Sequence, residues 1–147
     1  MRNLLIILAL TLAASALAGD LRLEDSSFST LAYIREDGRI EDDSFQTLGY
    51  IRDEGEDGIR IEDVEYTTLG YMDDGEIENA EYEEIYRLGE NGRLTDSHFR
   101  TVARITSDGT VEDSSFRVMI YTDGTDAHMT RKIAAYLIFF SDLLEEN

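Results

Sequence analysis

A phrase of alternating apolar and polar positions recurs along most of the chain. In the copy at residues 39–55, RIEDDSFQTLGYIRDEG, a short run rich in β-forming residues follows a polar linker and ends at an acidic residue and Gly. Six copies occur with a period of about 17 residues, starting at Arg22, Arg39, Arg60, Glu76, Arg93 and Thr110. This period fits one β-hairpin per copy, and the insertion Glu56–Ile59 lengthens one turn.

The turn sequences predict the strand register. Asp-Gly or Asn-Gly between two β-forming runs is a strong hairpin signal because Gly accepts positive φ. A three-residue loop places Ile34 opposite Ile40, and a two-residue turn at Asp74-Gly75 places Met72 opposite Ile77. The same reasoning pairs Leu88 with Leu94 and Ile105 with Val111. Loops of two lengths therefore preserve an apolar cross-strand pair.

The chain is thus predicted to be all-β, with tandem hairpins arranged radially or as a closed ring. Five hairpins are centred on Gly38, Gly55 to Gly58, Gly75, Gly92 and Gly109. One strand remains at each end, Leu21–Asp25 and Arg117–Thr122, and pairing of these two strands would close the ring and hide both sheet edges. Whether five or six blades result stays open at this point.

Alternation assigns the residues of each hairpin to two faces. Small residues at Ala32, Gly49, Gly70 and Ala103 share a face with the apolar pairs, which indicates close packing against a bulky element. Six aromatic residues recur in the linkers and are interpreted as hinge or core residues: Phe28, Phe45, Tyr66, Tyr82, Phe99 and Phe116.

The segment 126–147 differs from the repeats. Residues 133–140 are continuously apolar but too few to span a bilayer. Met129, Ile133, Leu137, Phe140 and Leu144 fit a helical stripe, and a buried strand is the alternative. We expect a short helix that plugs or caps the hairpin ring, with Arg131 and Lys132 facing its acidic residues. Insertion into a membrane or a partner is the competing interpretation.

The first residues have the features of a secretory signal peptide, with an apolar stretch followed by Ala16-Leu17-Ala18. The expected organisation is a signal peptide at 1–18 (19 at the latest), a repeat domain at 19–125 and the apolar segment at 126–147. A secreted or periplasmic location follows. The chain has no Cys, which excludes a lipoprotein anchor and disulfides.

The charge of the chain limits its partners. After removal of the signal peptide, 12 basic residues face 32 acidic ones, a net charge of −20. Such a surface repels nucleic acid and anionic membranes. A glycan or a cell-surface protein is the expected partner.

Four tyrosines recur at one repeat position, Tyr33, Tyr50, Tyr71 and Tyr121. Tyrosine joins a flat apolar ring to a polar tip, as a sugar- or protein-binding platform requires. A half-buried sheet explains the same residues by packing. Arg87 and Arg104 occupy the position in the other two copies, so six equivalent sites are not expected.

The densest carboxylate cluster includes Asp53, Glu54 and Asp57 and is a candidate Ca²⁺ site. An EF-hand loop starting at Asp53 would place Val64 where the bidentate Glu belongs, so that motif fails. No catalytic motif occurs, and we expect neither enzymatic activity nor a cofactor. A carboxylate-dependent hydrolase ranks third, after a binding or structural protein and a cation-binding module.

The segment SSFSTLAYIREDGRIEDDSFQTLGYIRDEG, together with KIAAYLIFF near the end, resembles the five-fold β-flower proteins, secreted bacterial chains built from similar repeats. The resemblance covers roughly residues 21–140. It implies radially arranged hairpins and supplies no catalytic residues. The stretches EEIYRLGENG, RVMIYTDG and EDGI depart from the repeat, which affects the symmetry more than the fold.

These observations together favour a secreted, non-catalytic repeat protein with a structural or glycan- or protein-binding role. The ligand, the oligomeric state and the choice between periplasm and cell exterior stay open.

Overall fold

Twelve strands and one helix form the part of the chain that the structure, a computed structural model, describes: residues 19–56, 58–123 and 127–145. The strands are β1 (Leu21–Glu24), β2 (Thr30–Ile34), β3 (Arg39–Asp42), β4 (Thr47–Asp53), β5 (Ile59–Asp63), β6 (Thr68–Asp73), β7 (Glu76–Asn79), β8 (Glu84–Leu88), β9 (Arg93–Asp96), β10 (Thr101–Ile105), β11 (Thr110–Asp113) and β12 (Val118–Thr122). The helix α1 is Ala127–Phe139. The signal-peptide prediction at 1–18 lies outside the described residues.

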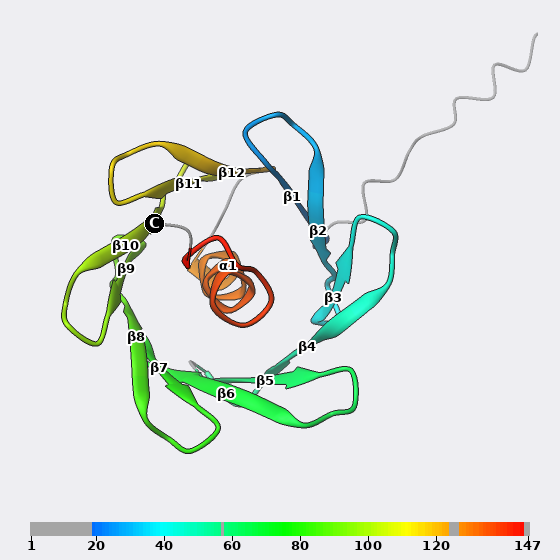
Figure 1. The fold of residues 1–147 in the computed structure, drawn as a ribbon. Coiled ribbons are helices and arrows are strands. Elements are labelled where there is room, and N and C mark those ends of the chain that lie inside the picture. Colours follow the sequence, from blue (N-terminus) through cyan, green and yellow to red (C-terminus); the bar gives the residue numbers. More distant parts are fainter. Residues whose placement is uncertain (1–18, 57, 124–126, 146–147) are drawn as a thin grey trace, which may run out of the picture.

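The strands form one closed antiparallel barrel (Figure 1). Each strand pairs with its neighbour in sequence, and β1 pairs with β12 through Leu23 opposite Thr122 and Glu24 opposite Tyr121. The predicted all-β ring, closed by its first and last strands, is confirmed. Closure leaves no edge free among the twelve described strands to pair with another chain.

The register predicted across the glycine turns is also confirmed. Ile34 lies opposite Ile40, Met72 opposite Ile77, Leu88 opposite Leu94 and Ile105 opposite Val111. These residues point inward, and all but Leu88 are buried. Turn length and side-chain alternation are local properties, so they determine the register without knowledge of the whole fold.

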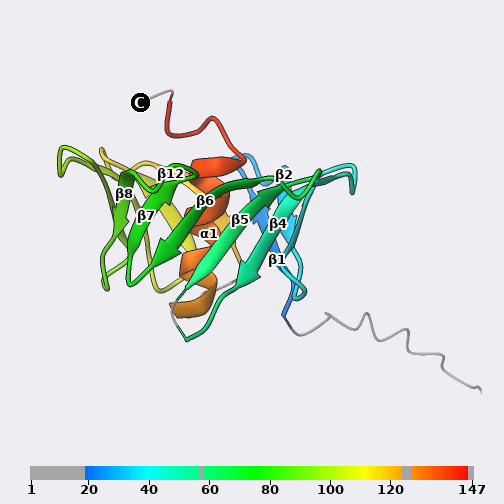
Figure 2. The same ribbon diagram turned by 90° about the horizontal axis from the view of Figure 1, so that it is seen from below.

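The barrel opens into six petals, each a strand pair with its outward turn: β1–β2, β3–β4, β5–β6, β7–β8, β9–β10 and β11–β12 (Figure 1). A register shift interrupts the pairing in every petal. We call the glycine turns that connect one petal to the next the inner turns. The strand pairings across these five turns show no register shift within the described residues. A bulge bends and twists a strand, so the shifts account for petals that splay from one end of the barrel (Figure 2).

Helix α1 runs along the barrel axis and fills its interior (Figures 1 and 2). Residues 132–137 of the helix are all buried, so the helix is enclosed around its whole circumference. The core also includes Leu21, Leu23, Ala32, Ile34, Ile40, Ile51, Ile59, Ile61, Met72, Ile77, Leu94, Ala103, Ile105, Val111 and Ile120 from the strands. The segment is a helix, as predicted, and not a strand. It plugs the barrel.

Two details of that prediction were wrong. The helix ends at Phe139, so Phe140 and Leu144, two residues of the predicted stripe, lie beyond the end of the helix. Lys132 is 4% exposed and forms no ion pair with a carboxylate of the described residues, so it does not engage an acidic ring. Its position on an enclosed helix, rather than attraction to carboxylates, buries its aliphatic stem.

Small residues on the inner face make room for the aromatic end of the plug, as predicted. A Cβ on Gly49 would lie 2.5 Å from Cε1 of Phe140 and 2.3 Å from the backbone oxygen of Glu62. A Cβ on Gly70 would lie 2.5 Å from Cζ of Phe139. All three distances are far below contact distance, so glycine is required where the strands meet the phenylalanine rings.

The glycines of the inner turns have a further role. Gly38 has a φ of 85°, and its carbonyl accepts a hydrogen bond of 2.7 Å from the backbone N–H of Ile51 on β4. The same bond recurs between Leu88 and Gly75, Ile105 and Gly92, and Thr122 and Gly109. These four of the five inner turns are therefore fastened to the next petal.

Gly49→Ala should reduce stability, because its Cβ would force apart a strand and the phenylalanine ring of Phe140. We expect the free energy of unfolding to fall by about 1–3 kcal/mol, measured by urea unfolding. Gly89→Ala is the matched control, because Gly89 is exposed and its nearest atom to a new Cβ is the Asn91 side chain at 3.2 Å. An equal decrease in the two variants would contradict the packing argument.

Candidate functional site

Each petal ends in the same five-residue turn, built around a carboxylate or amide. In the first petal, Oδ1 of Asp25 accepts hydrogen bonds from the backbone N–H groups of Ser27 and Ser29, at 2.8 and 3.0 Å. Asp42, Asp63, Asn79, Asp96 and Asp113 make the equivalent pairs of bonds. A side chain that mimics a backbone acceptor stabilises a tight turn in this way.

The fourth residue of each turn is aromatic and left-handed. Its φ lies between 61° and 64° in all six petals. Most L-residues avoid this conformation, at a cost of roughly 1–2 kcal/mol, and glycine or asparagine usually occupies it. An aromatic residue at this position in all six turns therefore needs a separate reason.

These six aromatics, which we call the tip aromatics, are solvent-exposed. Their exposed fractions are 66% for Phe28, 61% for Phe45, 62% for Tyr66, 65% for Tyr82, 80% for Phe99 and 71% for Phe116. Their interpretation as core residues was wrong. They do lie where the chain reverses direction, but in the turn within each petal rather than in a linker between hairpins. The bulged petals carry the tips outward, away from the core that their apolar character suggested.

The four predicted binding tyrosines each stack on the tip aromatic of the next petal around the ring. Ring centroids are 4.9 Å apart for Tyr121 and Phe28, 5.2 Å for Tyr33 and Phe45, 5.1 Å for Tyr50 and Tyr66, and 4.8 Å for Tyr71 and Tyr82. The rings are within 18° of parallel in every pair. One face of each tyrosine is therefore occupied by an intramolecular contact.

Two of these pairs are also covered by arginine. The guanidinium carbon of Arg35 lies 4.8 Å from the ring centroid of Tyr33, and that of Arg52 lies 4.5 Å from Tyr50. Arg35 in turn donates to the buried Glu41 at 2.7 Å, which raises the pKa of the Arg35 guanidinium. The outward surfaces of the tip aromatics, rather than the tyrosines, are left open for a ligand.

The third and fourth petals show the same contact with a polar link. The Tyr82 hydroxyl donates to the Tyr71 hydroxyl at 3.2 Å, and this bond raises the pKa of Tyr82. The two bonded hydroxyls offer hydrogen-bonding groups beside the stacked rings.

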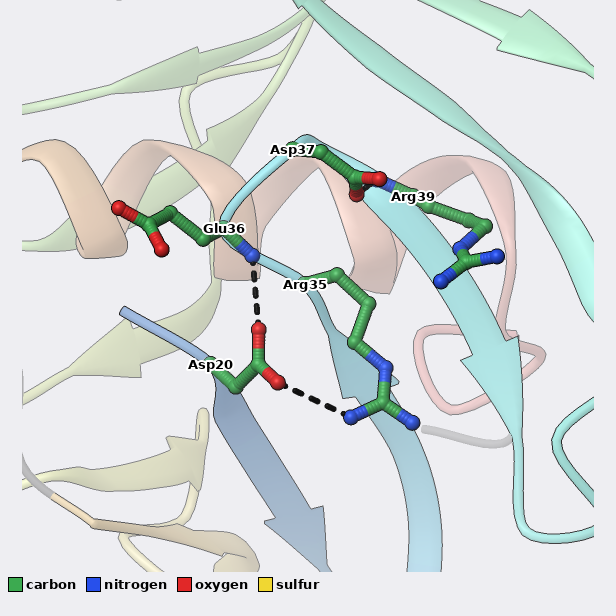
Figure 3. A pocket seen from close by; sticks show the side chains of 5 residues that line it. All are labelled: Asp20, Arg35, Glu36, Asp37 and Arg39. Carbon is green, nitrogen blue, oxygen red and sulfur yellow. Dashed lines mark hydrogen bonds and ion pairs between the residues drawn. The ribbon is translucent and has the colours of Figure 1, made fainter. Parts of the chain in front are cut away.

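A shallow depression of about 400 Å³ lies beside an inner turn, lined by Asp20, Arg35, Glu36, Asp37 and Arg39 (Figure 3). Asp20 accepts from the backbone N–H of Glu36 at 2.9 Å and from Nη1 of Arg35 at 3.0 Å. Asp20 and Arg35 are thus engaged with each other, and these contacts tie the residue before β1 to the turn after β2.

The candidate calcium residues do not all lie in the described part of the chain. Asp53 and Glu54 are exposed, Glu54 pairs with Arg60 at 2.9 Å, and Asp57 lies outside the described residues. Among the described residues, no three carboxylate or histidine side chains converge in a way that would hold a metal ion. The calcium site stays a prediction.

Helix α1 holds a tyrosine with altered acidity inside the barrel. Burial, and to a lesser degree the charge of Asp142, raises the pKa of Tyr136 to about 12. Tyr136 is 5% exposed, so its hydroxyl is a packed group of the helix rather than part of the outer surface.

A family model described as 5-fold beta-flower protein matches residues 20–141. The chain belongs to this family. The match spans the barrel and the helix that fills it, as the sequence resemblance implied. This β-flower has twelve strands in six petals, whereas the family description counts five-fold symmetry.

No curated protein and no solved structure matches the chain significantly. Within the described residues, no helix has the length and apolar character needed to span a bilayer.

The sequence presented both halves of each aromatic pair, but only the tyrosines were proposed as a binding surface, and the tip aromatics were assigned to hinges or the core. The signal that could have placed the tip aromatics in turns was the sequence D-x-x-F, D-x-x-Y or, in one copy, N-x-x-Y, in which the aromatic occupies a turn position that favours glycine. The pairing itself joins residues of adjacent petals, which alternation within a hairpin does not reveal.

Phe99 provides a test of what the tip aromatics contribute. Within the described residues its ring stacks on no other aromatic, whereas Phe45 stacks on Tyr33. Glycine relieves the left-handed backbone equally in both turns. Phe45→Gly should therefore be less stable than Phe99→Gly by about 0.5–1.5 kcal/mol in urea unfolding. Equal stability of the two variants would show that stacking contributes nothing.

Asp113 makes the barrel sensitive to acid. Backbone hydrogen bonds, with Arg117 the largest cause, lower the pKa of Asp113 below its ordinary value. A lowered folded-state pKa stabilises the fold fully above the unfolded pKa, about 3.9, and this contribution disappears as pH falls through the folded value. Wild-type melting temperature should therefore decrease more steeply than that of Asp113→Asn between about pH 4 and pH 2.

Asn79 shows why that variant is a fair comparison, because its Oδ1 accepts the same two backbone bonds at 3.0 Å without titrating. Asp113→Asn should keep the turn and remove the ion pair with Arg117. Parallel pH profiles for the two proteins would exclude Asp113 as a source of the acid sensitivity.

Proposed function

We propose that this β-flower is a secreted or periplasmic, non-catalytic binding module that holds a glycan through the tip aromatics. The observation that carries the proposal is the exposure of 61–80% at all six tips, combined with a left-handed backbone at each. Stacking on a tyrosine of the neighbouring petal uses one face of a tip aromatic. It does not explain why the rest of the ring is exposed to solvent, whereas ligand binding does.

Sugar rings suit such a surface because their C–H faces are flat and apolar. An aromatic side chain presents a rigid ring with few rotatable bonds, so little conformational entropy is lost when a sugar packs on it. The stacked tyrosine behind four of the tips fixes the ring orientation before a ligand arrives. This preorganisation favours binding over a free aromatic on a loop.

The circular arrangement supports a polymeric ligand rather than an isolated sugar. Six tips surround one end of the barrel (Figures 1 and 2), and a chain that contacts two of them gains from effective concentration without any new type of interaction. The affinity of each single contact can then be weak while the affinity for the polymer is high.

The proposal is tested by co-sedimentation of the protein with insoluble cellulose and chitin, two glycans without acidic groups. Phe28→Ala/Phe45→Ala should weaken binding roughly two- to tenfold for each aromatic ring removed, which corresponds to about 0.5–1.5 kcal/mol. Phe28→Tyr/Phe45→Tyr should retain binding, because Tyr66 and Tyr82 occupy the equivalent positions.

Val64→Ala is the matched control, since Val64 is a 50% exposed apolar residue in the β5–β6 turn but has no ring. Unchanged sedimentation of the double alanine variant would reject the tip aromatics as the binding surface. Absence of binding by the wild-type protein to either polymer would reject neutral glycans as ligands.

A further inference from the structure

We infer that the outer face of the β9–β10 petal is a carboxylate site, which binds an acidic sugar of the glycan through Arg93 and Arg104. The inference rests on the proposed glycan-binding function and names the sugar class that this petal selects. In other repeats an outer-face arginine is paired with a carboxylate, whereas these two arginines lie opposite each other without one among the described residues.

At the equivalent repeat position on β1, β3 and β5, arginine has a partner two residues later on the same strand. Arg22 pairs with Glu24 at 2.9 Å, Arg39 with Glu41 at 3.2 Å and Arg60 with Glu62 at 3.0 Å. The equivalent positions on β9 are Arg93 and Thr95. Threonine cannot neutralise the guanidinium, so Arg93 lacks the carboxylate that the repeat supplies elsewhere.

The residue opposite Arg93 increases the local positive charge. Arg39 and Arg60 lie opposite Tyr50 and Tyr71, but Arg93 lies opposite Arg104. Like charges directly opposite on neighbouring strands destabilise a sheet. Neither arginine forms an ion pair with a carboxylate of the described residues, although Glu112 is in register with Arg104 on its other side.

An aromatic ring completes the surface. The guanidinium carbon of Arg104 lies 5.9 Å from the centroid of the tip aromatic Phe116, which is 71% exposed. A planar carboxylate fits the donor fork of arginine, and the C–H face of the same sugar fits a phenyl ring. The combination matches a hexuronate better than a neutral hexose or a free inorganic anion.

The charge distribution around the barrel allows an acidic ligand to approach this petal. Residues 19–83 carry 21 acidic and five basic residues, a net charge of −16. Residues 84–122, which include β8 to β12, carry six acidic and five basic residues, a net charge of −1. The strongly acidic side of the barrel repels a uronate chain, so the ligand is directed to the nearly neutral side formed by β8 to β12.

The test measures binding of an oligogalacturonate and of its methyl-esterified form by calorimetry. The native protein should prefer the free acid, and the preference should decrease with added salt. Arg93→Gln/Arg104→Gln should weaken binding of the free acid roughly tenfold or more, as expected when charge-assisted hydrogen bonds are removed. The melting temperature of this double variant should be unchanged or higher than that of the wild type, because two opposed like charges are removed.

Arg22→Gln is the matched control, because Arg22 occupies the repeat position of Arg93 and is already paired. Thr95→Glu is a second variant that keeps both arginines and restores the missing partner. Glu41 and Glu62 are buried to 5% and 8% exposure at the same repeat position, where Thr95 is 7% exposed, so a glutamate fits there. It should weaken free-acid binding in the same direction.

The outcomes separate the inference from the proposed function. Equal binding of acid and ester, or unchanged binding by the double variant, overturns the carboxylate site while leaving tip-dependent glycan binding intact. Binding of inorganic phosphate or sulfate as tightly as the oligogalacturonate also overturns it, since the site would then recognise charge without the sugar. Absence of all glycan binding by the wild type rejects both.

Discussion

The width of a twelve-stranded barrel is the constraint on which the rest of the structure depends. Eight strands enclose a space that their own side chains fill, and larger barrels leave a lumen. Here the lumen is occupied by helix α1, whose residues 133–137 are as buried as the strand residues around them. Gly49 and Gly70 complete the fit by admitting Phe140 and Phe139. Without this helix the inward-facing apolar residues of twelve strands would have nothing to pack against.

Filling the centre with a helix leaves the outer face of the barrel to polar and aromatic contacts. Bulges occur in the six petals and, within the described residues, not across the inner turns, so the barrel splays at one end only. The splayed turns then carry aromatic rings away from the core and onto the tyrosines of adjacent petals. The same geometry explains the stacked pairs and the exposure of the tip aromatics, which are the basis of the proposed function.

Differences among the repeats become informative once the barrel is closed. A ring of six identical petals would present six identical surfaces. Arg87 instead of tyrosine is neutralised by Glu76 at 2.7 Å, so that exchange preserves a paired outer face. Arg104 opposite Arg93 has no such compensation among the described carboxylates. The departures from the repeat are therefore of two kinds, one that maintains the surface and one that changes its chemistry.

The sequence alone determined the hairpins and their register, and it favoured a closed ring and a helical plug without deciding either. The hairpins and register follow from side-chain alternation and turn length, which act over a few neighbouring positions. Only the tertiary structure decided that Phe28 and its equivalents are exposed, that Tyr33 stacks on Phe45, and that Arg93 lies opposite Arg104 without a carboxylate from the described residues. Those relations depend on where bulges bend the petals and on which petals become neighbours. Alternation along a single strand carries no information about either.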